Sequence, residues 1–448
     1  MKVGIVGAGA AGLAAAYDLS NAGHQVVIYE SAPFIGGQAS TIPVGGHPLE
    51  RGYHHLFTND KAILDLMEEL GIGDAMEWYP SNVGTYVDGG LHKTTTAFDL
   101  LRFSAIPIWE RIRMGLFTLR VQRIKDWESL EPYTADHWLS EKLGGQAYDV
   151  LWNPLLRGKF GRFYGEVGMP WFWSKIQTRF ASREGLLAKE VLGYPTGSFD
   201  VVFDALAAEI RASGGEVRME NPVTEIAPKN EAGSVGIKYV DAGREQIECF
   251  DCVLSTVPSF IMPSLMPAMP DGYLRRLESV QYLAAVVVIL ELEHKLTDFY
   301  WMNIASDDVP FLGIIEHTNM LPKEWYNDRH VVYLTNYLHR NDELFKLPSD
   351  ELTDLYLSHL PKFNAGFHRS WVKDVHYNAV SAAQPIIGTE YGAKKPSHRT
   401  PFERVYLANT TQIYPEDRGT NYSIRMGREV AEMMLTDATA GWSDWRSN

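Results

Sequence analysis

The first forty residues contain the pattern that most constrains the fold of this chain. An apolar stretch at 2–6 leads into a glycine-rich turn, a helix-forming stretch follows, and a second apolar stretch at 25–29 ends beside Glu30. The glycines of the turn are Gly7, Gly9 and Gly12. This order of strand, glycines, helix, strand and acid predicts a Rossmann-like α/β unit that binds a dinucleotide.

Each part of the pattern has a physical role. Gly7 allows the tight turn out of the strand, Gly9 lets the backbone approach a pyrophosphate, and Gly12 lets helix and strand pack closely. The helix N-terminus offers free N–H groups to the phosphates, and the Glu30 carboxylate can accept hydrogen bonds from an adenosine ribose. The predicted contacts here are Gly7, Ala8, Gly9, Ala10, Ala11, Gly12, Glu30 and Ser31.

A second group of residues distinguishes between dinucleotides. Gly36 and Gly37 lie where bare backbone can meet the pyrophosphate again, and the run LERGYHHLFTND follows at 49–60. This order resembles the flavin-dependent amine oxidase superfamily, which includes protoporphyrinogen oxidases and carotenoid desaturases. The resemblance implies FAD as the cofactor. It adds Gly37, Gln38, Gly52, Tyr53 and His54 to the predicted contacts. NAD(P) is the alternative, but no arginine follows Glu30 to bind a 2′-phosphate.

The length of 448 residues predicts two or three domains. We expect a discontinuous FAD-binding domain from residues 1–80, 193–269 and 391–448, and an α+β substrate domain from 81–192 and 270–390. In the second FAD segment, a helix over 199–212 precedes strands over 215–219, 234–240 and 245–249 and a further apolar strand. The resemblance implies that Val223 contacts the adenine through its backbone and that Thr256 lies near the cofactor.

The C-terminal segment predicts a strand that delivers Asn409 to its carboxyl end, then a helix from Gly419 to about residue 435. In open α/β sheets ligands collect at that edge, and a helix N-terminus stabilises the negative charge of a reduced flavin. The predicted contacts are Asn409, Thr420, Asn421 and Tyr422. The family usually has Gly-Asp or Gly-Glu where this chain has Ala408-Asn409, and an ordinary capping loop with an amphipathic helix is the alternative.

The substrate domain is expected to place two long strands, at 281–293 and 330–338, over the flavin. Its tryptophans at 152, 171 and 173 form either a substrate cage or simply core, and core is favoured. The resemblance implies dehydrogenation of a C–N or C–C bond of a small organic substrate, with hydride transfer to flavin N5. The stretch 283–287 lacks the lysine of many amine oxidases, which places the chain nearer to the protoporphyrinogen oxidase and desaturase branch.

His54, His55 and Tyr414 are the candidate catalytic residues, because imidazole titrates near neutral pH and can guide a proton. Histidines satisfied by the backbone are an equally good interpretation. Arg157 and Lys159 could hold an anionic substrate, although solvated surface charges are the commoner outcome.

Two other functions remain open. The run at 52–57 also resembles UDP-galactopyranose mutases, which are redox-neutral isomerases that use reduced FAD; His54 matches their first histidine, but Phe57 stands at the second. A binding protein that keeps FAD only for stability is the third interpretation. No motif identifies the electron acceptor or the small-molecule substrate.

Composition limits the partners and the location. A net charge of −15 argues against nucleic-acid binding. No apolar run of membrane-spanning length occurs, and Met1-Lys2 leads straight into the first strand, so a cytoplasmic protein is expected. Cys249 and Cys252 lack a second ligand pair, so buried structural thiols are expected rather than a zinc site.

The segment 99–125 carries six basic residues and two acids among many apolar side chains. A basic amphipathic helix can lie in a bilayer interface. The alternative, which is favoured here, is an ordinary helix that packs on the core and presents a solvated charged face. Pro107 is expected to interrupt the pattern.

Overall fold

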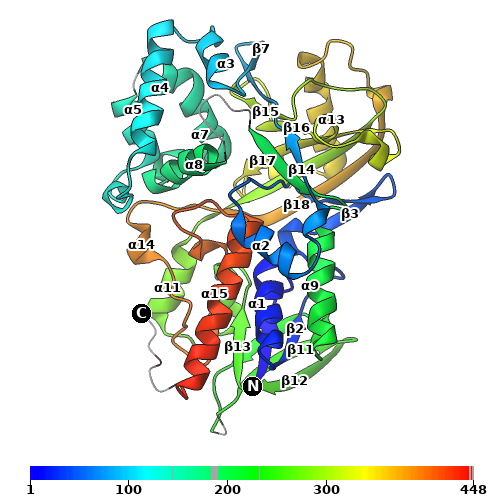
Figure 1. Ribbon diagram of the computed structural model, residues 1–448, viewed down its shortest axis with the longest axis vertical. Helices are drawn as coiled ribbons and strands as arrows, with labels where there is room; N and C mark the ends of the chain where they lie inside the picture. Colours follow the sequence, from blue (N-terminus) through cyan, green and yellow to red (C-terminus); the bar gives the residue numbers. More distant parts are fainter. Residues whose placement is uncertain (144, 183–189, 232, 443–444, 446–448) are drawn as a thin grey trace.

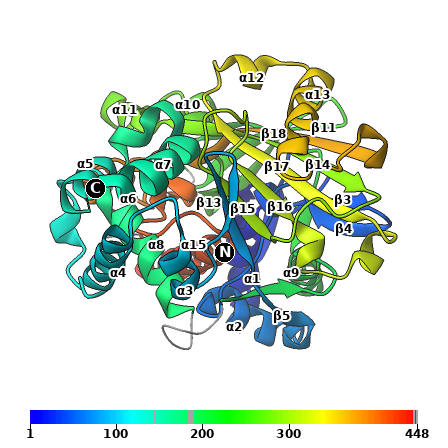
Figure 2. The same cartoon turned by 90° about the horizontal axis from the view of Figure 1, so that it is seen from above.

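The computed structural model describes residues 1–143, 145–182, 190–231, 233–442 and 445. Figure 1 shows two tiers: a parallel sheet with its helices below, and above it a large sheet beside a group of helices. Figure 2 shows the same upper tier from above, with α4 (Ile108–Gln122), α5 (Ala135–Lys142) and α8 (Met169–Ala181) on the side opposite α13 (Ser349–His359).

The lower tier is built on a five-stranded parallel sheet with the order β19-β13-β1-β2-β9. Its strands are β1 (Lys2–Val6), β2 (Gln25–Tyr29), β9 (Glu216–Arg218), β13 (Cys252–Ser255) and β19 (Val405–Leu407). The helices α1 (Ala10–Asn21), α9 (Asp200–Ala212) and α15 (Thr420–Thr439) accompany it. The predicted α/β class with a Rossmann-like sheet is therefore confirmed, and segments from the beginning, middle and end of the chain share one sheet.

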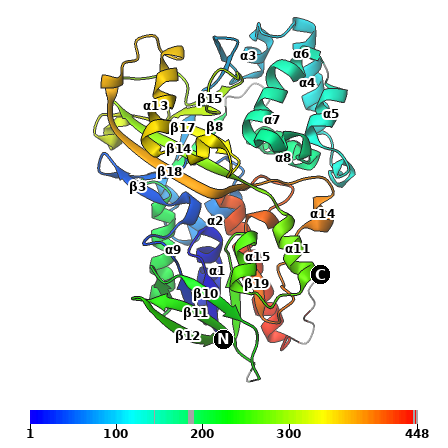
Figure 3. The same cartoon turned by 180° about the vertical axis from the view of Figure 1, so that it is seen from behind.

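A three-stranded antiparallel sheet lies near the N-terminus in Figure 3, formed by β10 (Val223–Ala227), β11 (Val235–Asp241) and β12 (Arg244–Phe250). The chain turns between Phe250 and Cys252 to enter β13. Cys252 is buried, as expected, but Cys249 is exposed, so the prediction of two buried thiols is wrong for Cys249. The physical reason is strand alternation, which points Cys249 away from the sheet face that packs on the core.

The upper tier contains a seven-stranded mixed sheet with the order β18-β14-β17-β16-β15-β6-β7. Its strands are β6 (Val83–Val87), β7 (Gly90–Lys93), β14 (Tyr282–Leu292), β15 (Trp301–Ile304), β16 (Gly313–Glu316), β17 (His330–Leu338) and β18 (Val372–Pro385). All eleven residues of β14 are buried, because this strand lies between β17 and β18 and both of its faces are covered.

The helical group has a core of its own. It comprises α3 (Ala97–Arg102), α4, α5, α6 (Gly145–Ala147), α7 (Asn153–Phe160) and α8. Met114, Phe117 and Leu139 are among the side chains buried there. Pro107 is the N-cap of α4, and the chain is not helical between Arg102 and Ile108, so the expected interruption of the pattern over 99–125 is confirmed. In the described part of the chain, no helix combines the length and apolar character needed to cross a membrane.

The remaining strands and α-helices are short. They are β3 (Thr41–Val44), β4 (His47–Glu50), α2 (Lys61–Glu69), β5 (Met76–Pro80), β8 (Val191–Pro195), α10 (Met262–Leu265), α11 (Asp271–Ser279), α12 (Glu343–Lys346) and α14 (Tyr391–Lys394). One core joins the tiers, since Val287 and Tyr333 of the upper sheet belong to the same buried cluster as Val3 and Ile28 of the lower sheet.

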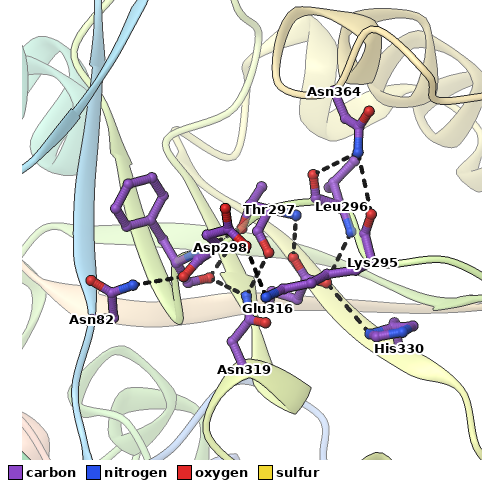
Figure 4. A network of polar contacts seen from close by, with 10 residues as sticks. Asn82, Lys295, Leu296, Thr297, Asp298, Glu316, Asn319, His330 and Asn364 are labelled. Carbon is purple, nitrogen blue, oxygen red and sulfur yellow. Dashed lines mark hydrogen bonds and ion pairs between the residues drawn. The ribbon is translucent and has the colours of Figure 1, made fainter.

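A buried carboxylate fastens the loop that follows β14. The two oxygens of Glu316 accept hydrogen bonds from the backbone N–H groups of Leu296, at 2.9 Å, and Thr297, at 2.5 Å (Figure 4). Burial raises the pKa of Glu316 to about 7. The loop is thereby held against the sheet whose other strands form the roof of the site described next.

Candidate functional site

The turn after β1 has the geometry that its glycines predict. Gly7 has a φ of +105°, and its N–H donates to Tyr29 O at 2.8 Å. A Cβ atom on Gly12 would lie 2.1 Å from Gly7 O, and one on Gly7 would lie 2.4 Å from Thr256 Oγ1. Side chains are therefore excluded at both positions, and Thr256 packs against the turn as the segment after β13 passes it.

The second glycine pair faces the first. Gly36 N donates to Ala8 O at 2.9 Å, and a Cβ atom on Gly37 would lie 3.1 Å from the Cα atom of Gly9. Two stretches of bare backbone thus meet at the N-terminus of α1. Such a concave surface of main-chain groups fits a pyrophosphate.

Glu30 lies at the carboxyl end of β2, where its carboxylate is fixed by the backbone. Oε2 accepts the N–H of Ala8 at 2.9 Å, and Oε1 accepts the N–H of Ala32 at 2.9 Å and the hydroxyl of Ser31 at 3.2 Å. The remaining lone pairs of a carboxylate held in this way can accept the hydroxyls of a ribose.

The N-terminus of α15 approaches the same region from the C-terminal end of the chain. Thr420 and Asn421 are buried, and Asn421 Oδ1 accepts the N–H of Ile63 at 3.1 Å. A Cβ atom on Gly427 would lie 2.2 Å from Ala11 O, so the helix packs directly on α1. This contact aims the positive end of a 20-residue helix at the cavity described below.

Asn409 lies at the carboxyl end of β19, as predicted, but its side chain bonds to protein groups. Its Nδ2 donates to Val257 O at 2.8 Å, and its Oδ1 accepts the N–H of Thr411 at 3.0 Å. These bonds join the segments that follow β13 and β19. The side chain of Asn409 therefore links these two segments of the protein. Val223, the predicted adenine contact, is the first residue of β10 in the three-stranded sheet.

A cavity of about 870 Å³ lies between the two tiers. It reaches from the α15 N-terminus past the seven-stranded sheet to α4, α7 and α8. The predicted residues that line it are Gln38, Gly52, Tyr53, His54, His55, Thr420, Asn421 and Tyr422. Most of the other lining side chains are apolar or aromatic, including Trp152 and Trp171, whereas Trp173 donates to Ile124 O. The cavity thus joins the predicted flavin contacts to an apolar interior.

The two histidines enter the cavity wall as neutral groups. Burial lowers the pKa of His54 to about 4 and that of His55 to about 3. His54 Nδ1 lies 2.6 Å from Gly52 O, and His55 Nδ1 lies 3.0 Å from the hydroxyl of Tyr300. Neutral imidazoles at neutral pH orient neighbouring groups by hydrogen bonding, and they are weak proton acceptors.

Two sequence candidates lie elsewhere. The Tyr414 hydroxyl donates to Glu131 Oε1 at 2.6 Å, and Tyr414 does not line the cavity. Arg157 lies over the Tyr164 ring, with 4.7 Å between its Cζ atom and the ring centroid, and it also stands outside the cavity lining. Neither side chain is brought to the predicted flavin contacts.

A charged cluster in the cavity was missed by the sequence analysis, except for Lys159. Asp417 Oδ2 accepts bonds from Lys175 Nζ at 2.6 Å and from Lys159 Nζ at 2.8 Å. The neighbouring Arg418 donates to the hydroxyl of Tyr337 at 2.9 Å. The preference for a solvated Lys159 is therefore wrong, because α7 turns this lysine inward towards Asp417.

Charge and burial compete in this cluster. Burial would raise the pKa of Asp417, but Lys159, Lys175 and Arg418 hold it well below its usual range. Burial lowers the pKa of Lys175 to about 8, although Asp417 opposes the shift. Lys175 is consequently a cavity side chain that changes charge close to neutral pH, as is Asp60, whose pKa burial raises to about 6.

The glycine turns, Glu30 and the α15 N-terminus fit an adenine dinucleotide that carries a flavin, because they combine a bare-backbone cradle, a ribose acceptor and a helix dipole beside a large cavity with mainly apolar walls. Together with the two-tier fold they define a FAD-dependent oxidoreductase. The family model described as flavin-containing amine oxidoreductase matches residues 10–435, and the chain belongs to that family.

Three known proteins illustrate the likeness. The 15-cis-phytoene desaturase of Synechococcus elongatus is 23% identical over 321 residues, which cover 66% of this chain and 67% of that protein. The crystal structure of a putative protoporphyrinogen oxidase from Exiguobacterium sp. 255-15 has a TM-score of 0.75 at 18% identity and covers 97% of this chain and 99% of the other. A reduced UDP-galactopyranose mutase has a TM-score of 0.74 at 14% identity, with 99% and 96% covered.

Proposed function

We propose that the chain is a FAD-dependent dehydrogenase that oxidises a C–C or C–N bond of a small, largely apolar organic substrate bound in the cavity. The observation that carries this proposal is the continuity of the cavity. The same space is lined by Tyr53 and Thr420, among the predicted flavin contacts, and by the apolar side chains of α4, α7 and α8. An apolar substrate placed there loses its water and approaches the cofactor.

Bound FAD would supply the two-electron acceptor for this oxidation. Gly7, Gly9 and Gly37 would hold its pyrophosphate, and Glu30 its adenosine ribose. The N-terminus of α15 would stabilise negative charge on the reduced flavin.

Other residues of the cavity would contact the substrate, orient groups in the wall and transfer a proton. Ala285 and Val287 of β14 line the cavity with apolar surface where many amine oxidases carry a lysine, which favours substrates without a free amine. Neutral His54 and His55 would orient groups in the wall. Lys175 Nζ, with its lowered pKa, would take up or release a proton at the polar end.

The test is anaerobic reduction of the purified holoprotein by candidate apolar substrates, such as polyisoprenoid alkenes and N-alkylated cyclic amines that carry no N–H group. Stoichiometric loss of the oxidised-flavin absorbance with formation of one new double bond supports a dehydrogenase. A mutase behaves differently, since it would convert UDP-galactopyranose only after dithionite reduction. A protein that shows neither response while retaining FAD would contradict the proposal and favour a scaffold role.

A further inference from the structure

The outer surface of α3 and α4 is unusually apolar. Six of the twelve large apolar side chains that are exposed in the described part of the chain lie there. They are Phe98 (54% exposed), Leu101 (44%), Ile108 (54%), Trp109 (60%), Ile112 (53%) and Leu116 (64%). We call this surface the α3–α4 patch. Figure 2 shows α4 at the edge of the helical group, further from the seven-stranded sheet than α8.

The patch arises because α4 is apolar on two opposite faces. Met114, Phe117 and Val121 are buried against the helical core, as expected for a packed amphipathic helix. On the other side, Trp109, Ile112 and Leu116 meet solvent where a charged face was expected. The favoured interpretation of this segment is thus correct for its packing and for its exposed arginines, but it did not include the apolar side chains that share the outer face. Contiguous exposed apolar surface of this kind marks an interaction site.

The charges around the patch are positive. Arg102, Arg113 and Arg120 are exposed, whereas the two acids of the segment are engaged. Asp99 closes the capping box with Thr96, and buried Glu110 accepts the N–H of Ala147 at 2.6 Å. A basic rim on a chain of net charge −15 is complementary to an anionic surface.

The cavity opens on this patch. Leu101, Ile112 and Leu116 are exposed and also line the cavity, so the mouth is framed by apolar side chains. We propose that the α3–α4 patch docks on a lipid bilayer that contains anionic lipids and thereby turns the cavity mouth towards the membrane. A lipid-dissolved substrate would then enter without crossing water. This entry route rests on the proposed function, whereas the docking does not.

A bilayer fits the patch better than a second copy of the chain. A two-fold dimer through this surface would bring the arginines of both copies together, and like charges across an interface oppose association. In a bilayer interface, by contrast, Trp109 and the aliphatic side chains would enter the acyl boundary while Arg113 and Arg120 remain at the headgroups.

The experiment is flotation of the full-length holoprotein with vesicles of phosphatidylcholine, with and without phosphatidylglycerol. We expect binding that requires the anionic lipid and weakens with salt. The double substitution Ile108→Glu/Trp109→Glu, at two exposed positions outside the cavity lining, should weaken binding by about tenfold or more. The control Ile247→Glu alters a side chain that is 62% exposed on β12 and should bind like the wild type.

Circular dichroism and flavin absorbance establish that each variant is folded. Wild-type protein that stays with the unbound fraction at every lipid composition would overturn docking. So would a double variant that floats like the wild type, or a wild-type dimer in light scattering that the double substitution dissociates. Flotation measures vesicle binding and involves no turnover. A protein that oxidises none of the candidate substrates can therefore still be shown to bind vesicles, and a protein that binds no vesicles can still be shown to be a dehydrogenase.

Discussion

The carboxylate of Glu30 accepts the backbone N–H of Ala8, with 2.9 Å between Oε2 and N. The residue predicted to bind the ribose therefore also braces the turn that meets the pyrophosphate. Charged hydrogen bonds of this kind contribute about 1.5–3 kcal/mol each. One substitution at Glu30 should consequently weaken both halves of the adenosine diphosphate site.

We expect Glu30→Ala to raise the dissociation constant for FAD by about tenfold or more, because a ribose acceptor and a brace of the turn are lost together. The measurement is the ratio of flavin to protein after gel filtration, with titration of the apoprotein. Glu209→Ala, at an exposed position of α9, is the control and should retain FAD fully. Equal retention in both variants would argue against the ribose assignment.

Gly427→Ala should destabilise the protein by roughly 1–3 kcal/mol and displace the α15 N-terminus. The reason is steric, since the added Cβ atom would lie 2.2 Å from Ala11 O. Gly272→Ala is the matched control: this glycine lies in helix α11 with nothing within 4 Å of the new atom, and the change should stabilise by up to about 1 kcal/mol. Chemical denaturation measures both. Similar values for the two variants would refute the close α1–α15 contact.

The titration of Lys175 should be visible in the flavin spectrum. Its pKa of about 8 means that the cavity loses a positive charge as the pH rises through that value. We expect the absorbance of the bound oxidised flavin to shift with a midpoint near pH 8. The shift should vanish in Lys175→Met, which keeps the apolar stem, and Lys159→Met should move the midpoint upward because one repelling cation is gone. An unaltered midpoint in Lys175→Met would assign the transition to another group.

Glu50 should give the protein a measurable pH dependence of stability. Burial raises its pKa from 4.5 to about 7, with Phe199 N and the Tyr194 hydroxyl as its hydrogen-bond donors. Because the pKa of Glu50 is higher in the folded protein than in the unfolded chain, protonation of Glu50 stabilises the fold. This stabilisation is fully present below about pH 4.5 and is lost as the pH rises through 7.

Glu50→Gln stays neutral. Its amide oxygen can accept the N–H of Phe199 and its NH2 group can donate to the oxygen of the Tyr194 hydroxyl, so at pH 8 it should be more stable than the wild type by up to roughly 3 kcal/mol. Urea denaturation at pH 5 and pH 8 measures the difference between the two proteins. Glu209→Gln, at the exposed control position, should follow the wild type. Parallel pH profiles for Glu50→Gln and the wild type would show that Glu50 is ionised throughout this range.

The dinucleotide site was predictable because its signals are local. Gly7, Gly12 and Glu30 lie in one βαβ unit, and β1 and β2 have the predicted ends. The charged cluster could not be predicted from the sequence. Lys175 comes from α8 and Asp417 from the loop before α15, and no sequence spacing relates them.

The sequence also could not predict the directions in which some side chains point. Tyr414 stands close to α15 in sequence, yet its hydroxyl turns to Glu131. In the same way, the composition of residues 99–125 indicated an amphipathic helix without showing which apolar side chains would be buried. Both outcomes depend on packing between distant segments.

The contact between Gly427 and Ala11 brings the last helix of the chain onto the first. The glycine turn precedes β19 and the N-terminus of α15 by some four hundred residues. A nascent chain in which α15 has not yet been synthesised therefore lacks one wall of the flavin site, and the site can be completed only after that helix has been made.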